Sequence, residues 1–458
     1  MRPVRASAGR YSARRPGAPV VPAPAIRMVA VPSPEPLLRA ASDSAMADLR
    51  PFRAYRPPVA LARAVASPPY DVLDSDEARA MADGNPHAFL HVTKPEIDLP
   101  VGTDLYADEV YAKGAANLAE FIRQGTLVRD PSPCFYVYRQ RMGSHVQTGL
   151  VAGASVQEYD DGRIKKHEKT RQDKEDDRTR HQLALGAQTG PVFLTYPQRA
   201  DIDAIVAEIC SAAPDADFVA DDGIGHTLWV VAEPSRIDAI RAAFASIPAL
   251  YVADGHHRSA AASRVRAARH AEQPNAGPDA PWEHFLSVTF PHDQMQILDY
   301  NRVVLDLAGK SQDAFLAEVA AAFEVEPCGE CKPSEPRTFT MCLAGSWYRL
   351  RARPGSFPAD HPVDSLDVSI LQDNLLSPVL GIGDPRKDKR IDFVGGIRGT
   401  AELARRVAKG AAVAFALYPT SMAQLMAIAD AGEIMPPKST WFEPKLRSGL
   451  FVRSITEL

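Results

Sequence analysis

The sequence has few cysteines, no long apolar run and no strong excess of charge. Its five cysteines are an odd number without a secretory signal, which argues for reduced thiols in a cytoplasmic protein. No apolar run approaches the roughly 20 residues of a membrane-spanning helix, so we expect a soluble protein without a membrane partner. A net charge of −5 argues against a protein that holds nucleic acid by bulk electrostatics.

The cysteines also supply little that could hold a metal. Cys328 and Cys331 form one Cys-x-x-Cys motif, and Cys342 lies nearby in the sequence. A structural zinc site normally needs a second pair or histidines at a set spacing, and no fourth ligand is evident. We therefore predict no metal or redox site from this motif.

The chain has 458 residues, enough for two or three domains. Residues 1–45 are rich in Ala, Pro, Arg and Ser with almost no acid, which predicts a disordered extension before a natural start at Met46. We expect a main α/β domain over 46–330 and a smaller α+β region over 338–458 that packs back on it. Helical segments between apolar strands favour a mixed sheet with the ligand at the strand ends.

The most informative stretch runs from Ala249 to Ser259 and continues into an Ala-rich segment. A short apolar run followed by Asp254-Gly255 and helical spacing predicts a strand, a tight turn and a helix. The start of such a helix attracts anions, phosphates in particular. Asp254 would be repelled by a phosphate unless a metal ion or a reacting hydroxyl lay between them, so it indicates chemistry. The alternative is that Asp254 only caps the helix.

A second cluster of charges contains His167, Glu168, Lys169, Thr170 and Arg171. It follows a predicted strand and precedes a charged helical run, and loops in that position often hold catalytic groups. A glutamate among lysines and a histidine suits a general base or a metal ligand. A solvated helix with i,i+4 ion pairs explains the same charges equally well.

Three further segments offer candidate ligand contacts. Ser67-Pro-Pro-Tyr70-Asp71 is a rigid elbow that fixes its polar side chains, and Asn85–Val92 is predicted to be a turn leading into a strand. Asn301 and Arg302 follow a predicted strand. Lys438, Ser439 and Thr440 suit a phosphate or carboxylate, although a tail folding back on the body also explains them.

Several segments together resemble a known family. They are Arg50-Pro-Phe-Arg, Ser67-Pro-Pro-Tyr-Asp-Val, Asn85-Pro, His167-Glu-Lys-Thr, Asp254-Gly-His-His-Arg, Asp299-Tyr-Asn-Arg and Met435-Pro-Pro-Lys-Ser-Thr. From Met46 to the C-terminus the chain is similar to the domain-of-unknown-function 1015 family. The Asp254–Arg258 turn is also similar to one in the ParB/sulfiredoxin-like superfamily, and within it most resembles the free-serine kinases.

This resemblance implies a ParB/sulfiredoxin-like nucleotide-binding core. It implies a kinase or related phosphoryl transferase that uses ATP or ADP with Mg²⁺ on free L-serine or a similar hydroxy compound. Glu168 would be the base, with Asp254 and His167 as further catalytic residues and Asp254 as the Mg²⁺ ligand. The nucleotide would contact Gly255, His256, His257, Arg258 and Ser259. Substrate contacts would come from Lys169, Thr170, Arg171, Tyr70, Asp71, Asn301, Arg302, Lys438, Ser439 and Thr440.

Two other functions remain open at this point. One is a ParB-like nucleotide-binding switch that forms a homodimer without small-molecule turnover. The other is a metal-dependent hydrolase that uses His167, Glu168, His226, Asp254, His256 and His257. Adjacent residues at a helix start diverge by about 100°, which argues against His256 and His257 holding one ion together. The kinase hypothesis requires the carboxylates of Glu168 and Asp254 to open into one cleft at the strand ends.

Overall fold

The structure, a computed structural model, describes residues 47–457. The predicted disordered extension and the predicted start at Met46 therefore lie outside the described residues. Within 47–457 the strands form a nine-stranded sheet, a six-stranded sheet and three two-stranded pairs. No helix in this part of the chain is long and apolar enough to cross a membrane.

The large sheet is mixed, as predicted. Its order is β6–β11–β8–β12–β5–β4–β10–β9, with β1 paired to β5. β11 runs parallel to β6 and β12 runs parallel to β8, whereas the other neighbours are antiparallel. The strands are β1 Leu49–Arg50, β4 Phe135–Met142, β5 His145–Ser155, β6 Ile164–Lys165, β8 Val192–Tyr196, β9 Ala216–Val219, β10 Gly225–Val231, β11 Leu250–Asp254 and β12 His284–Pro291.

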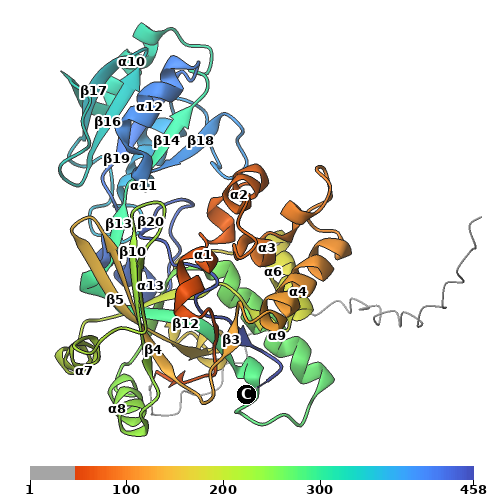
Figure 1. Cartoon of the computed structure of the whole chain (residues 1–458). Helices are drawn as coiled ribbons and strands as arrows, with labels where there is room; N and C mark the ends of the chain where they lie inside the picture. The colour runs from red at the N-terminus through yellow and green to blue at the C-terminus, as the bar shows by residue number, and fades with distance from the viewer. Residues whose placement is uncertain (1–46, 458) are drawn as a thin grey trace, which may run out of the picture. The chain divides into compact units, whose positions relative to one another are not determined.

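The large sheet carries a core on each face because strand side chains alternate. In β4, Phe135 and Val137 enter one core, and Tyr136 and Tyr138 enter the other. The first core also contains apolar side chains from four helices. These are α5 Val156–Asp160, α7 Ala200–Cys210, α8 Pro234–Phe244 and α9 His256–Glu272, of which α7 and α8 lie side by side (Figure 1).

One group of helices lies before β4 in the chain, and its last member, α6, follows β6. The group contains α1 Ala62–Val65, α2 Ser75–Ala82, α3 Leu90–Thr93, α4 Asp108–Arg123 and α6 Gln172–Leu185. The strand predicted at the end of Asn85–Val92 is wrong, because the chain forms α3 there. Phe89 and Val92 pack together with α4, whereas Leu90 packs with α2. The i,i+3 spacing of Phe89 and Val92 on one face is helical, since a strand would instead place Leu90 and Val92 together.

The six-stranded sheet has the order β15–β17–β16–β19–β14–β18. Its strands are β14 Tyr300–Val304, β15 Phe323–Cys328, β16 Thr338–Leu343, β17 Ser346–Ala352, β18 Ile391–Gly395 and β19 Val413–Leu417. The helices of this part are α10 Gln312–Ala322, α11 Asp367–Leu371 and α12 Gly399–Ala408. The next helix, α13 Met422–Asp430, lies by the large sheet, where Asp430 contacts Lys165 of β6 and Tyr251 of β11 (Figure 1). Leu403 and Val407 of α12 pack on Val303, Cys342 and Val394 of the sheet.

Short strand pairs tie distant segments together. β13 Gln296–Leu298 pairs with β20 Trp441–Glu443, so the chain enters and leaves the six-stranded sheet along one antiparallel ladder. β21 Arg453–Ser454 pairs with β7 Ala187–Gln188, and β2 Tyr55–Arg56 pairs with β3 Val128–Arg129. The C-terminal tail therefore returns to the part of the chain that precedes β14.

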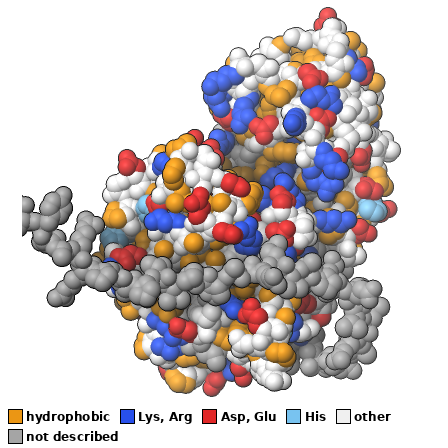
Figure 2. All heavy atoms as spheres, turned by 90° about the vertical axis from the view of Figure 1, so that its right-hand side faces the viewer, with side chains coloured by type: hydrophobic (Ala, Val, Ile, Leu, Met, Phe, Trp, Pro, Cys, Tyr) orange, Lys and Arg blue, Asp and Glu red, His pale blue; other side chains and the backbone are white. Residues whose placement is uncertain are grey.

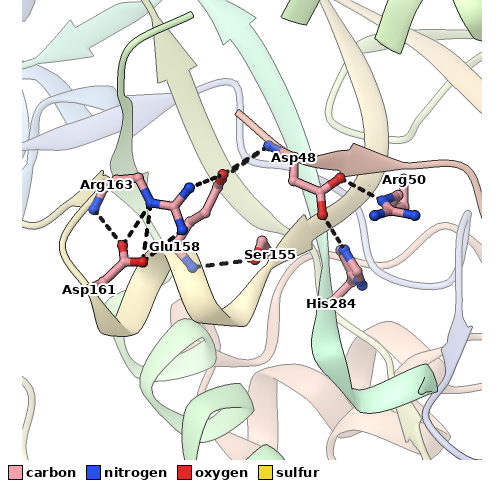
Figure 3. Close-up of polar contacts among 7 residues, drawn as sticks. All are labelled: Asp48, Arg50, Ser155, Glu158, Asp161, Arg163 and His284. Atoms are coloured by element: carbon pink, nitrogen blue, oxygen red, sulfur yellow. Dashed lines mark hydrogen bonds and ion pairs between the residues drawn. The ribbon is translucent and has the colours of Figure 1, made fainter. Parts of the chain in front are cut away.

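A polar network anchors β1 beside the large sheet (Figure 3). The backbone N–H of Asp48 donates to both carboxyl oxygens of Glu158, at 3.1 and 3.2 Å, and Arg163 lies 3.1 Å from the same carboxyl. The carboxylate of Asp48 contacts Arg50 at 2.5 Å and His284 at 3.1 Å. Burial raises the pKa of Glu158 to about 7.

Candidate functional site

The start of α9 forms the strand, turn and helix that the sequence predicts. β11 ends at Asp254, Gly255 adopts φ +98°, and α9 begins at His256. A Cβ atom at Gly255 would lie 3.2 Å from Cζ of Arg258 and 3.4 Å from Cα of Val192, so both the conformation and the space favour glycine. No side chain caps α9, and the alternative that Asp254 serves only as its cap is wrong.

The carboxylate of Asp254 is held by two cations. Its Oδ2 lies 2.9 Å from Nζ of Lys445, and its Oδ1 lies 3.8 Å from the guanidinium of Arg258. Burial alone would raise the pKa of Asp254, but the charges of Lys445 and Arg258 hold that pKa well below its usual range. Asp254 is therefore ionised and paired at neutral pH.

Arg258 is turned toward groups of the protein. It is 8% exposed, donates to the carbonyl of Pro191, and lies 3.5 Å from the carboxylate of Asp71. Arg258 was predicted to contact the nucleotide, whereas in the structure its guanidinium contacts two carboxylates and a carbonyl. Its geometry instead orients Asp71 and Asp254.

Tyr70 and Arg258 both line a small cavity of about 20 Å³. The cavity is also lined by Arg178 and Gln182, and the guanidinium of Arg178 lies 3.9 Å from the centroid of the Tyr70 ring. Burial raises the pKa of Tyr70 to about 12, so its hydroxyl remains protonated. A space of this size holds about one water molecule.

The two charged loops meet at one edge of the large sheet. Because β6 and β11 are parallel neighbours, the loops after them leave the sheet at the same end. Oε2 of Glu168 lies 3.4 Å from Nδ1 of His256, and the rings of His167 and His256 meet edge to face at 4.4 Å. The backbone N–H of Arg171 donates to Nε2 of His257 at 3.1 Å. The structure thus brings the Glu168 loop against the first turn of α9.

The histidines at this junction are neutral at physiological pH. Burial lowers the pKa of His167 and of His256 to about 3, and it also lowers the pKa of His257. A neutral imidazole can donate through one nitrogen only. His256 can therefore donate from Nδ1 to Glu168, and its buried Nε2 has no hydrogen-bond partner among the described residues.

Other predicted contacts of these loops are used within the protein. The hydroxyl of Ser259 is fully buried and donates to carbonyls of its own helix at 3.1 and 3.2 Å. Thr170 donates to Glu175, and the guanidinium of Arg171 pairs with Asp173 at 2.7 Å. Lys169 is exposed.

The remaining predicted residues gather beside the β13–β20 ladder. Asn301 is fully buried, donates to Asp299 at 2.5 Å and accepts from the backbone of Leu417 at 3.1 Å. Arg302 donates to backbone carbonyls, and Ser439 donates to the carbonyl of Pro436 at 2.6 Å. Lys438 is exposed, and Thr440 precedes β20. The polar groups of Asn301, Arg302 and Ser439 thus bond within the fold.

His226 lies apart from the histidines of the two loops. It is on β10, where Nδ1 lies 2.7 Å from the hydroxyl of Tyr138 and Nε2 accepts from Arg447 at 3.3 Å. The shared metal site that the hydrolase hypothesis needs is not formed. Within residues 47–457, no group of three His, Cys, Asp or Glu side chains is arranged to hold a metal ion.

Lys445 is the residue of this junction that the sequence did not reveal. It is 191 residues from Asp254 in the chain, in a proline-flanked tail whose neighbouring Lys438, Ser439 and Thr440 drew the prediction. A lone lysine in a tail has no spacing that identifies its partner. Only its place five residues after the Met435-Pro-Pro-Lys-Ser-Thr motif could have suggested it as a candidate.

Positive charge is concentrated locally on the surface. Lys and Arg side chains gather in a hollow on the face drawn in Figure 2, although the net charge of the chain is −5. Local clusters of this kind raise the concentration of anions near a surface.

These features define a mixed α/β protein in which two charged loops meet at one edge of the large sheet. The chain belongs to the family described as "Protein of unknown function (DUF1015)", which matches residues 49–369. The predicted family membership is thereby confirmed. A search of curated proteins found no match.

Three solved structures are similar to the chain at low identity. A conserved hypothetical protein from Pyrococcus furiosus is 15% identical with a TM-score of 0.32, over 64% of this chain and 92% of that one. A free serine kinase in complex with AMP is 11% identical with a TM-score of 0.31, over 62% and 88%. SbnI with a C-terminal truncation, from Staphylococcus aureus, is 12% identical with a TM-score of 0.34, over 66% and 87%.

Proposed function

We propose that this protein is a nucleotide-dependent kinase of a small hydroxy compound such as free L-serine. The observation that carries the proposal is the junction of Glu168 with the first turn of α9, where Oε2 lies 3.4 Å from Nδ1 of His256. A carboxylate next to a helix start combines a proton acceptor with an anion-binding end. These are the two parts that phosphoryl transfer to a hydroxyl needs.

The nucleotide phosphates would bind at Gly255, His256 and His257. The first N–H groups of a helix have no partner within the helix, and the helix dipole favours negative charge there. Gly255 has no side chain to keep a ligand from its backbone. Arg258 would act through Asp71 and Asp254, which it contacts at 3.5 and 3.8 Å.

Glu168 would accept the proton of the substrate hydroxyl. As the hydroxyl oxygen bonds to the terminal phosphorus, the bond from that phosphorus to the bridging oxygen breaks and leaves the shortened nucleotide. The side chain of Glu168 is 35% exposed, which leaves it accessible to a substrate. His256 is a positioning residue, because its neutral ring can direct the carboxylate through Nδ1.

The predicted Mg²⁺ ligand does not fit its role. Asp254 is bonded to Lys445 at 2.9 Å and faces Arg258, so a cation would have to displace an ammonium group to reach it. We therefore assign no step of the transfer to a metal held by Asp254.

The test is a transfer assay with ATP or ADP, Mg²⁺ and a panel of hydroxy amino acids and sugars that includes L-serine. We expect one phosphorylated product, and we expect Glu168→Gln to lower kcat by about 10²- to 10⁴-fold with little change in nucleotide affinity, because only the proton acceptor is lost. Glu272→Gln, at an exposed glutamate of α9, is the matched control.

Two outcomes would contradict the proposal. One is the absence of any phosphorylated product across the panel. The other is full activity in Glu168→Gln. Nucleotide-dependent dimerisation without a phosphorylated product would instead favour the ParB-like switch.

A further inference from the structure

We propose that Lys445 binds a phosphate group at the start of α9 and that Asp254 positions it there. The ammonium group of Lys445 would take the place beside Asp254 for which the sequence predicted Mg²⁺. The identity of the ligand as a nucleotide rests on the proposed function, whereas the binding of a phosphate by Lys445 can be tested separately.

The ammonium group of Lys445 has donors to spare. Its Nζ donates to Oδ2 of Asp254 at 2.9 Å, its one hydrogen-bond acceptor among the described residues, and it also lies 5.0 Å from the centroid of the Trp441 ring. An ammonium group carries three N–H donors, so two remain. The lysine is mostly buried, with 16% of its side chain exposed. A buried cation with unused donors beside a helix start is suited to an anion.

The pair stays ionised because each partner supports the other. Burial alone would lower the pKa of Lys445, but the charge of Asp254 raises that pKa above its usual range. Asp254 is in turn kept ionised by Lys445 and Arg258. An incoming phosphate would therefore meet a lysine that is already charged and fixed in place. That preorganisation lowers the cost of binding.

Attachment of the C-terminal tail does not depend on the charge of Lys445, whose structural partner is Asp254. The tail on either side of Lys445 is already attached to the loops and the sheet. The backbone N–H of Met435 donates to the carbonyl of His167 at 2.8 Å, and Arg447 donates to His226 at 3.3 Å. Ser448 forms a backbone bridge with Ser67. These bonds hold the tail without an ammonium group at position 445.

The experiment measures binding of pyrophosphate and of ADP by calorimetry, with a thermal melt of each variant without ligand. Lys445→Met alone would leave Asp254 buried and unpaired, so the double variant Asp254→Asn with Lys445→Met is used to retain folding. We expect its affinity for pyrophosphate to fall at least tenfold while its ligand-free melting midpoint stays near that of the wild type. Lys445→Arg should restore part of the affinity. Lys387→Met, at a lysine whose side chain is 83% exposed, should bind as the wild type does.

The affinity should also depend less on salt in the double variant, because one charge contact is lost. Equal pyrophosphate affinity in the wild type and the double variant would overturn the assignment of Lys445. Pyrophosphate binding through Lys445 without transfer to any acceptor would overturn the proposed kinase and leave this assignment standing. A wild type that binds neither pyrophosphate nor ADP would overturn both.

Discussion

Glu158 is a buried carboxyl group whose pKa lies close to neutral pH. Its side chain is 3% exposed, and burial raises its pKa to about 7 from a usual value of 4.5. Between these values the folded chain binds a proton that the unfolded chain has released. The contribution of Glu158 to the free energy of unfolding therefore falls as the pH rises from 4.5 through 7, whatever the other groups of the chain contribute.

Glu158→Gln should remove this pH dependence. The free energy of unfolding of the variant, relative to the wild type, should rise by on the order of 3 kcal/mol from pH 4.5 to pH 8. Urea unfolding at several pH values measures the difference. Glu272→Gln, at a glutamate with 58% exposure, should show no such trend. A constant difference between Glu158→Gln and the wild type would refute the assigned pKa.

The C-terminal tail is the element on which several distant parts of the fold converge. At Gly449 it has φ +89°, and a Cβ atom there would lie 2.7 Å from Cβ of Phe89 and 2.9 Å from Cγ1 of Val65. Backbone strain and the clash with Phe89 and Val65 act together. We expect Gly449→Ala to lower the free energy of unfolding by about 3 kcal/mol.

Gly277→Ala is the control for this prediction. Gly277 does not adopt a positive φ, and its added Cβ would meet nothing within 4 Å. Its free energy of unfolding should change by less than about 0.5 kcal/mol. If the midpoints of the two alanine variants in urea were equal, the close approach of the tail to Phe89 would be wrong.

The sequence predicts local elements better than it predicts partners. The strand, turn and helix around Gly255 follow from the apolar run, the glycine and the helical spacing, which are all local signals. The family was also recognisable from its motifs. The pairing of Asp254 with Lys445 was not, because nothing in either segment encodes a contact across 191 residues.

Burial is the second property that sequence reasoning missed. Asn301 and Ser439 are polar residues near the ends of predicted elements, so the sequence predicted that they contact a ligand. In the structure the side chain of Asn301 bonds to Asp299, and that of Ser439 bonds to the carbonyl of Pro436. The same short polar side chains satisfy buried backbone groups and bind ligands. Only the three-dimensional environment distinguishes the two uses.

At the scale of the whole molecule, buried histidines dominate the predicted response to acid. Burial lowers the pKa of four of them to about 3, namely His167, His181, His226 and His256. Below pH 6.5 the unfolded chain protonates these four side chains and the folded chain does not. Glu158 and Asp367 act in the opposite direction, because burial raises the pKa of each to about 7.

Below pH 6.5 the four histidines bind protons in the unfolded chain only, whereas Glu158 and Asp367 bind protons in the folded chain only. The unfolded chain therefore carries about two more protons than the folded chain on these six groups. Stability should therefore fall as the pH drops below 6.5, with a slope on the order of 3 kcal/mol per pH unit between pH 5 and 6. Chemical denaturation at pH 7, 6 and 5 measures this slope. A stability that stays level or rises toward pH 5 would contradict it.

The ladder between β13 and β20 bears on how members of the family can diverge. Leu298 and Trp441 face each other across this antiparallel pair. The six-stranded sheet thus lies in a segment whose two ends are joined side by side by the β13–β20 ladder, so a change of length within the segment leaves the ladder in place. We expect the loops and helices between β14 and β19 to vary most in length among relatives, and the approach of Lys445 to Asp254 to survive that variation.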